Sequence, residues 1–185
     1  RRGPRKGQDL QTESTITFRE SVYGTTLDLR LNVEGRAQQI TARVPAGVQD
    51  GAKIRVKGKG APGEAGPGDL FIYLHVKHHP VFGRKGENLT MTLPITFAEA
   101  ALGADVKIPT LEGNEVTVRI APGTPTGRTL RVKGKGVTKG HHTGDLLVTV
   151  EVQVPRRAEG KVEAAIKAFA EATKDEDVRA EFRDK

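Results

Sequence analysis

The sequence contains no cysteine and no tryptophan, and aromatic residues make up only 4% of it. Without cysteine, the chain can form neither disulfides nor thiolate metal sites, and it is compatible with a reducing compartment. No apolar run approaches the roughly 20 residues that a membrane-spanning helix needs, so we expect a soluble protein with no membrane partner. Aromatic side chains that could stack on nucleic-acid bases are scarce.

Glycine and proline are plentiful, with 22 and 10 residues, and valine, isoleucine, leucine and threonine dominate the short apolar runs. This composition is typical of short strands joined by turns. The sequence predicts strands at residues 15–18, 27–31, 40–44, 54–56, 70–76, 89–93, 106–108, 116–120, 130–132 and 146–154.

An internal repeat is the most informative feature of the chain. Residues 54–60, IRVKGKG, return at residues 130–136 as LRVKGKG, at an offset of 76 residues. Upstream, ITF at residues 16–18 returns at residues 95–97, at an offset of 79. A register held over this length predicts two copies of one small domain, at residues 10–87 and 88–155. We expect the function to belong to the pair.

Short motifs in both copies predict matching helical turns and reversals. Thr17 with Glu20, and Thr96 with Glu99, fit the capping-box pattern, and a glycine at residue 24 or 103 ends each turn. The two glycines of each Gly-Lys-Gly block, at 58 and 60 and at 134 and 136, are expected to take positive φ where a strand reverses. The aspartates of the two Gly-Asp-Leu triplets are expected to hold their own turns.

The two ends of the chain differ in composition from the repeats. Residues 1–9 contain two glycines and a proline without apolar periodicity, which predicts the end of a linker. Residues 157–173 are strong helix formers, with Val162, Ile166 and Phe169 on one stripe. The sequence therefore predicts a C-terminal helix and tail at residues 156–185.

The net charge of +7 does not by itself indicate a nucleic-acid partner. Residues 1–9 hold four basic and one acidic side chain, and residues 156–185 hold eight of each, which leaves +4 for the repeats. The aromatic residues lie within apolar strand patterns rather than among the basic ones. A basic nucleic-acid-binding module is therefore the third of our functional hypotheses.

Motifs for catalysis and for metal binding are missing. Lys59 and Lys135 are each followed by glycine, whereas a phosphate loop requires Ser or Thr and a following helix. The histidines at residues 75, 78, 79, 141 and 142 have no cysteine or spaced carboxylates to complete a metal site. No serine lies in a G-x-S-x-G elbow. We expect no cofactor, no metal and no catalytic residue, and hence a protein that is not an enzyme.

The motifs taken together resemble a known family. The tandem R-V-K-G-K-G and G-D-L blocks, HHPVFGRKGENL between them, and LPITFAEAALGADVKIPTLEG at the start of the second copy closely resemble the C-terminal substrate-binding region of DnaJ-family J-domain co-chaperones. The resemblance implies a mostly β fold, with two tandem, homologous, small β-sandwich-like domains, short helical turns and a C-terminal α-helix. It also implies a cytoplasmic homodimer that captures unfolded polypeptide and delivers it to a DnaK-type ATP-dependent chaperone.

Two parts of the family pattern are absent. There is no J domain with a His-Pro-Asp loop, so we expect the chain by itself to bind without stimulating the partner's ATPase. Many relatives also insert a cysteine-rich zinc domain where residues 31–37 make a short connection. Either this member of the family lacks that domain, or the domain has been removed from this chain.

The resemblance also implies where clients and the second copy bind. In the family, extended client segments lie against an apolar groove of the first domain. Residues 27–31 alternate leucine with charge, so Leu29 and Leu31 share one face and are the first candidates. The alternative is that these leucines fill the core. Further candidates for client binding are Ile16, Ser14, Thr12 and Phe82. The candidates for dimerisation are Val162, Ile166 and Phe169.

Three functions are thus compared. The leading one is a co-chaperone fragment that binds unfolded or extended apolar segments without any chemistry of its own. The alternative is a structural or adaptor module that recognises one specific protein or peptide. A peptide array separates these two by the breadth of segments bound, and salt dependence isolates nucleic-acid binding.

Overall fold

A computed structural model describes residues 3–183. Strands dominate and are followed by one longer helix, which confirms the predicted fold class. The elements, in chain order, are β1 (Leu10–Ile16), α1 (Phe18–Tyr23), β2 (Thr25–Val33), β3 (Arg36–Val44), β4 (Lys53–Val56), β5 (Leu70–Val76), β6 (Phe82–Lys85), β7 (Asn88–Thr96), α2 (Phe97–Leu102), β8 (Ala104–Pro109), β9 (Glu115–Ile120), β10 (Thr129–Val132), β11 (Thr138–Lys139), β12 (His142–Thr143), β13 (Leu146–Gln153), α3 (Gly160–Ala172) and a 3₁₀ turn (Ala180–Phe182).

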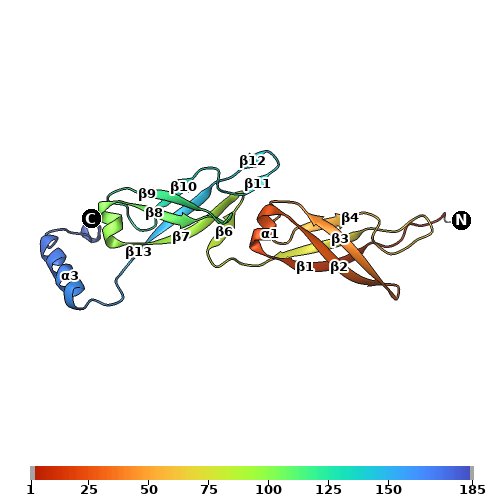
Figure 1. The fold of residues 1–185 in the computed structure, drawn as a ribbon, viewed down its shortest axis with the longest axis horizontal. Helices are drawn as coiled ribbons and strands as arrows, with labels where there is room; N and C mark the ends of the chain where they lie inside the picture. Colours follow the sequence, from red (N-terminus) through yellow and green to blue (C-terminus); the bar gives the residue numbers. More distant parts are fainter. Residues whose placement is uncertain (1–2, 184–185) are drawn as a thin grey trace.

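The strands form two lobes that lie end to end along the long axis of the molecule (Figure 1). The first lobe contains the sheet β1-β5-β4 and the hairpin β2-β3. The second lobe contains the sheet β10-β13-β7-β6, the hairpin β8-β9 and the short pair β11-β12. Helix α1 lies between the lobes, and α3 lies at the far end of the second lobe (Figure 1).

Strand pairing repeats between the lobes in the same register. β1 runs parallel to β5 with Thr12 opposite Ile72, and β7 runs parallel to β13 with Met91 opposite Val148. In the hairpins, Leu29 of β2 lies opposite Ile40 of β3, as Ile108 of β8 lies opposite Val116 of β9. The two offsets read from the sequence, 76 and 79 residues, therefore convert a position in one lobe into its counterpart in the other.

Alternating side chains build the core of the first lobe. Leu70, Ile72 and Leu74 of β5 are fully buried, and the residues between them are half-buried. The hairpin β2-β3 packs its apolar face against the same cluster. The fully buried members of this cluster are Ile16, Ile40, Ala42, Val44, Leu70, Ile72 and Leu74.

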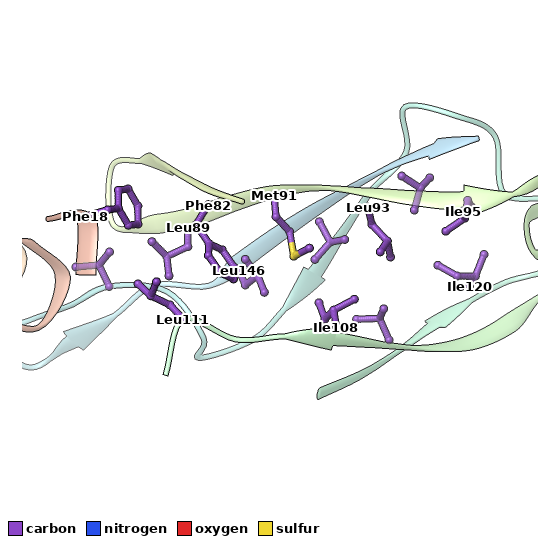
Figure 2. Packing of buried hydrophobic residues seen from close by; sticks show 14 of the residues in the cluster. Phe18, Phe82, Leu89, Met91, Leu93, Ile95, Ile108, Leu111, Ile120 and Leu146 are labelled. Carbon is purple, nitrogen blue, oxygen red and sulfur yellow. The ribbon is translucent and has the colours of Figure 1, made fainter. Parts of the chain in front are cut away.

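Helix α1 belongs to the first repeat but packs in the core of the second lobe. Phe18 and Val22 join the buried cluster that contains Phe82, Leu89 and Leu111. Figure 2 shows Phe18, on the α1 ribbon, at one end of the row of buried side chains that fills the second lobe. The junction between the lobes is thus a continuous apolar core rather than a loose linker.

Polar contacts close the junction from the outside. The guanidinium of Arg84 in β6 donates to the carbonyl oxygens of Gly47 and Val48 in the first lobe, at 2.8 and 2.6 Å. Burial lowers the pKa of Arg84 from its usual value. Arg19 of α1 donates in the opposite direction, to the carbonyl oxygen of Leu111. Both lobes therefore contribute donors and acceptors to their contact.

The turn before β6 is held by a histidine ring. Nδ1 of His79 accepts the backbone N–H groups of Val81 and Phe82, at 3.0 and 3.1 Å. The ring lies between Phe18 and Phe82, with centroid separations of 5.7 and 5.3 Å. His79 is therefore part of the junction.

Both predicted capping boxes are present. The Thr17 hydroxyl accepts the Glu20 N–H, and the Glu20 carboxylate accepts the Thr17 N–H, at 3.1 and 2.8 Å. Thr96 and Glu99 make the same pair of bonds before α2. Each of these helices is a short cap on one end of a sandwich.

Three strands were not predicted, namely β6, β11 and β12. β1 begins at Leu10, earlier than the predicted residue 15. The prediction missed this part of the strand because Thr12 and Ser14, on its inner face, are polar. β6 lies before the predicted domain boundary at residue 88, yet it pairs with β7 in the sheet of the second lobe. No helix within residues 3–183 is long and apolar enough to cross a membrane.

Candidate functional site

The two Gly-Asp-Leu aspartates stabilise turns, as the sequence predicts. The Asp69 carboxylate accepts the Gly58 N–H at 2.9 Å and Nε of Arg55 at 2.8 Å. These bonds hold the pKa of Asp69 below its ordinary value, with the Gly58 N–H as the main cause. Its carboxylate is therefore saturated by its own turn.

The second lobe repeats this arrangement. The Asp145 carboxylate accepts the Gly134 N–H at 2.8 Å and Nη1 of Arg131 at 2.5 Å. Its pKa is lowered for the same reasons, the backbone hydrogen bond first. Within residues 3–183, no group of three His, Asp or Glu side chains is arranged to hold a metal ion.

The glycines of the Lys-Gly-Lys-Gly blocks have two different roles. Gly58 and Gly134 take the predicted positive φ, both at 76°. Gly60 and Gly136 do not, so the prediction for this pair was wrong. A Cβ on Gly60 would lie 2.6 Å from the backbone carbon of Gly68, so the residue is glycine because two chain segments approach each other closely.

The predicted leucines lie on the inner face of β2. Leu29 and Leu31 are half-buried and pack against the first-lobe cluster, whereas Asp28 and Arg30 between them are exposed. The predicted alternation is therefore present. The inner face of β2 is covered less completely than that of β3, where Ile40 is buried.

Candidates on β1 share that strand's inner face. Thr12 and Ser14 are half-buried, and Ile16 is buried with 1% exposure. The parallel register places them opposite residues of β5, with Thr12 beside Ile72 and Ser14 beside Leu74. Polar side chains thus take inner positions along the edge of this sheet.

β1 and β2 both have a free edge in the first lobe. A hollow lined by Gln39 and Ile40 of β3 and by Gly58 and Gly60 after β4 places β3 over the β4 side of the sheet. β2 pairs with β3, and its leucines pack on the core cluster to which Ile16 of β1 also belongs. We call the half-buried inner positions of these two edge strands, Thr12, Ser14, Leu29 and Leu31, the edge groove.

In the second lobe, large apolar side chains fill the positions that correspond to the edge groove. The counterparts of Thr12 and Ser14 are Met91 and Leu93, both buried with 7% exposure. The counterpart of Leu29 is Ile108, which has no exposed surface. The first lobe therefore carries small polar residues where the second carries large apolar ones, and this difference leaves its leucines half-covered.

The strand edges differ as well. β6 pairs antiparallel with β7 and covers its edge, with Phe82 opposite Met91. β1, the counterpart of β7, is the edge strand of its own sheet. A hollow of about 430 Å³ lies on the outer face beside this strand, lined by Gln11, Thr12, Glu13 and Tyr73. The first lobe therefore combines a free backbone edge with half-buried apolar side chains on its inner face.

Phe82, the last client-binding candidate, lies elsewhere. Its exposure is 6%, and it belongs to the buried cluster of the second lobe rather than to that of the first. The ring is enclosed because β6 pairs with β7 and because Phe18 packs nearby. The structure does not bring Phe82 together with Leu29 and Leu31.

The dimerisation candidates form the exposed stripe of α3. Val162, Ile166 and Phe169 are 43%, 42% and 49% exposed, and α3 has no buried residue. One aromatic contact connects this helix to the second lobe, between Phe169 and Phe97 of α2. The stripe is therefore only half covered within its own chain.

Sequence reasoning missed one further repeat. Arg84-Lys85-Gly86 and Leu89 recur at an offset of 79 as Arg5-Lys6-Gly7 and Leu10. The Asp69 N–H is bound by the Asp9 side chain at 2.7 Å, as the Asp145 N–H is bound by the Asn88 side chain at 2.8 Å. Residues 5–9, which were predicted as linker, thus carry the first copy of this motif.

Known proteins with similar sequences support the family assignment. The profile of the DnaJ C terminal domain matches residues 10–155. The chain belongs to this family. "Chaperone protein DnaJ 1" of Streptomyces avermitilis is 41% identical over 97% of the chain, and its namesake in Streptomyces coelicolor is 40% identical over the same share. "Chaperone protein DnaJ 2" of Corynebacterium glutamicum is 46% identical over 91%.

The chain spans only part of these relatives. It covers 62% of the length of the two Streptomyces proteins and 59% of the Corynebacterium one. The alignment to the Streptomyces avermitilis protein extends over 247 positions, more than the 185 residues of the chain. That relative therefore contains residues within the aligned region that have no counterpart here.

Proposed function

We propose that the chain binds extended apolar segments of unfolded polypeptides in the edge groove and acts as part of a co-chaperone that presents them to a DnaK-type chaperone. The observation that carries the proposal is the contrast between the lobes. Thr12 and Ser14 stand where Met91 and Leu93 fill the second lobe, and the β1 edge is uncovered where β6 covers β7. An extended segment can supply both the missing strand and the missing apolar side chain.

The names of the full-length relatives support a chaperone role for the protein to which this chain is similar. The matched proteins are chaperones of the DnaJ type. The groove needs only apolar contact and backbone hydrogen bonds, which suit clients of many sequences.

Dimerisation is the second part of the proposal. The α3 stripe of Val162, Ile166 and Phe169 is half exposed, and a short isolated helix is marginally stable in water. We infer that α3 packs against a second copy, so that two edge grooves bind one long client. Two linked sites raise the effective concentration for the second contact.

A substitution in the groove tests client binding. Leu29→Gln with Leu31→Gln removes the apolar wall, and we expect weaker suppression of client aggregation. Asp28→Gln with Arg30→Gln, on the other face of the same strand, is the matched control and should leave suppression unchanged. Circular-dichroism melts must show that both proteins remain folded. Full suppression by a folded Leu29→Gln/Leu31→Gln protein would contradict the proposal.

A second variant tests the groove without weakening the core. Thr12→Met with Ser14→Leu copies the side chains of the second lobe into the first. We expect this filled protein to melt at the same or a higher temperature and to lose client binding. Retained client binding by the folded variant would place the client site elsewhere.

A further inference from the structure

The sheets of the two lobes differ on the face that points away from the core. In the order β1-β5-β4 of the first lobe, β5 is the central strand, and its half-buried outer residues include Phe71 and Tyr73. Their counterparts on β13 of the second lobe, at the offset of 76 residues, are Leu147 and Thr149. Because the solvated face of a sheet usually carries polar side chains, packing of the core does not explain the two aromatic rings.

Basic residues lie beside these rings on β4. The antiparallel register places Arg55 opposite Phe71 and Lys53 opposite Tyr73. Both basic side chains are exposed, and Nζ of Lys53 lies 4.9 Å from the centroid of the Phe71 ring. Lys57, which follows the strand directly, is exposed as well. The sequence did not indicate this cluster, because only the pairing of β4 with β5 brings the basic and aromatic residues together.

Acidic residues are arranged so that the β4 side keeps its positive charge. Asp69 is only 4% exposed, and its carboxylate accepts the Gly58 N–H and Nε of Arg55. Glu13 lies on the other side of the rings, on β1, where its carboxylate is 3.5 Å from Nε2 of His75. The outer face therefore changes from basic along β4 to polar and acidic along β1.

Groups that can form hydrogen bonds lie on the β1 side. The hollow of about 430 Å³ on this face is lined by Gln11, Thr12, Glu13 and Tyr73. The amide of Gln11 can both donate and accept, whereas the carboxylate of Glu13 accepts. The hollow thus offers an aromatic wall together with polar groups that can recognise the edge of a planar, nitrogen-containing ring.

We propose that this face of the β1-β5-β4 sheet binds single-stranded nucleic acid. We call it the outer sheet face, and it is formed by Gln11, Lys53, Arg55, Phe71 and Tyr73. The phosphates lie along the basic residues of β4, and bases stack on the two rings of β5 with their edges toward β1. Proteins that bind single strands combine a basic track with aromatic side chains in this way. The edge groove consists of inner positions of the same lobe, so this site adds a second function to the proposed one.

The rings decide between nucleic acid and an acidic peptide. The face of an aromatic ring carries partial negative charge, so carboxylates gain nothing from Phe71 and Tyr73, whereas bases stack on them. A double helix is a poorer ligand, because its bases are already stacked on one another and present only their edges in the grooves. The strand can be DNA or RNA, since both contain phosphates and bases.

A fluorescent oligonucleotide tests this proposal on the whole chain. Strands of about 15 nucleotides, one of deoxythymidine and one of uridine, are titrated with the protein at low salt and followed by anisotropy. Phe71→Leu with Tyr73→Thr copies the side chains of the second lobe. This variant should bind both strands at least about tenfold more weakly, because two stacking surfaces are lost. Circular-dichroism melts check that it is folded.

The basic track is tested separately through the salt dependence of binding. Lys53→Thr copies Thr129 of the second lobe. It should reduce the slope of the logarithm of the binding constant against the logarithm of salt concentration by about 0.7, the value for one phosphate of a single strand. Lys107→Thr removes an exposed lysine from β8 and is the matched control, which should leave affinity and slope unchanged. An unchanged slope for Lys53→Thr would overturn the placement of the phosphates along β4.

Stacking is observed directly through tyrosine fluorescence. The chain has two tyrosines and no tryptophan, so Tyr23→Phe leaves Tyr73 as its one tyrosine. The emission of Tyr73 should fall as an unlabelled strand binds. Unchanged emission at saturation would show that no base stacks on this ring and would overturn the proposal.

The remaining outcomes separate this site from charge alone and from the edge groove. A folded Phe71→Leu/Tyr73→Thr protein that binds as tightly as the unchanged one would overturn the proposal. Equal affinity for a duplex of the same length, or equal competition by a polyglutamate of the same charge, would also overturn it. The Leu29→Gln/Leu31→Gln protein should lose client binding and keep nucleic-acid binding. Loss of nucleic-acid binding by that folded protein would place the strand in the edge groove and not on the outer sheet face.

Discussion

Phe169 of α3 packs edge-to-face on Phe97 of α2, with ring centroids 5.0 Å apart. Phe97 is the counterpart of Phe18, which is buried between the lobes. The same position of the repeat thus contacts the second lobe in one copy and the terminal helix in the other. The exposed end of the second lobe is where α3, and in our proposal a second copy, is bound.

The first prediction concerns this end of the molecule. Phe169→Asp places a charge in the half-covered stripe of α3, so we expect a dimer to dissociate to monomers because a buried charge is costly. Light scattering at micromolar concentration measures the mass. Phe182→Asp changes a phenylalanine that is 83% exposed in the 3₁₀ turn and is the matched control. A Phe169→Asp protein that keeps the dimer mass would exclude α3 from the interface.

The second prediction compares the two counterpart phenylalanines. Phe18→Ala leaves a cavity in the junction core and should lower the free energy of unfolding by about 3–5 kcal/mol. Phe97→Ala removes a side chain that is 49% exposed, and surface changes of this kind cost about 1 kcal/mol or less. Urea unfolding measures both. Equal losses for the two variants would show that α1 does not hold the lobes together.

Much of the fold was predictable because each repeat carries local signals. The Leu27 to Leu31 alternation, the capping boxes at Thr17 and Thr96, and the two Gly-Asp-Leu turns each specify structure through neighbours in the sequence. The repeat then doubled the evidence, since the same signals occur twice. These features agree with the structure for that reason.

Tertiary contacts decided what the sequence could not show. Phe18 and Phe97 follow equivalent N-caps. The neighbouring residues in the sequence therefore do not indicate that Phe18 is buried and Phe97 is exposed. Gly58 and Gly60 look alike in sequence, yet one needs a positive φ and the other a close backbone contact. The groove was predicted at Leu29 and Leu31, but its open edge became visible only when β1 was compared with β7.

The third prediction concerns acid stability. The pKa of Asp69 is lower in the folded state than in the unfolded state. The ionised carboxylate therefore stabilises the fold at any pH above its unfolded-state pKa, and this stabilisation is lost as pH falls through its folded-state pKa. The loss should develop as pH falls below the ordinary carboxyl range, because the lowered pKa keeps Asp69 ionised in the folded state when it is already protonated in the unfolded state. Asp69→Asn should flatten this part of the curve of unfolding free energy against pH. Asp175→Asn, in the tail, is the control and should reproduce the slope of the unchanged protein; an unchanged slope for Asp69→Asn would contradict the assignment.

The fourth prediction tests the close approach at the Lys-Gly-Lys-Gly blocks. A Cβ at Gly60 would lie 2.6 to 2.7 Å from the backbone atoms of Gly68 and Asp69, and one at Gly136 would lie 2.4 Å from those of Gly144 and Asp145. Backbone atoms cannot move aside as a flexible side chain can, so Gly60→Ala should displace the turn that Asp69 holds.

We expect Gly60→Ala and Gly136→Ala each to lower the free energy of unfolding by about 1–3 kcal/mol, as is typical of overpacked sites. The melting temperature of each variant should fall accordingly. Gly3→Ala is the matched control, because no atom lies within 4 Å of its Cβ position and it has no positive φ. Amide hydrogen exchange of Asp69 and Gly58 localises the effect in the Gly60→Ala protein, since their hydrogen bonds define the turn. Both alanine variants could instead melt like the Gly3→Ala protein, with unchanged amide hydrogen exchange. That result would show that close backbone contact is not the reason for glycine at these positions. The repeated Val-Lys-Gly-Lys-Gly sequence would then have a role outside the turn.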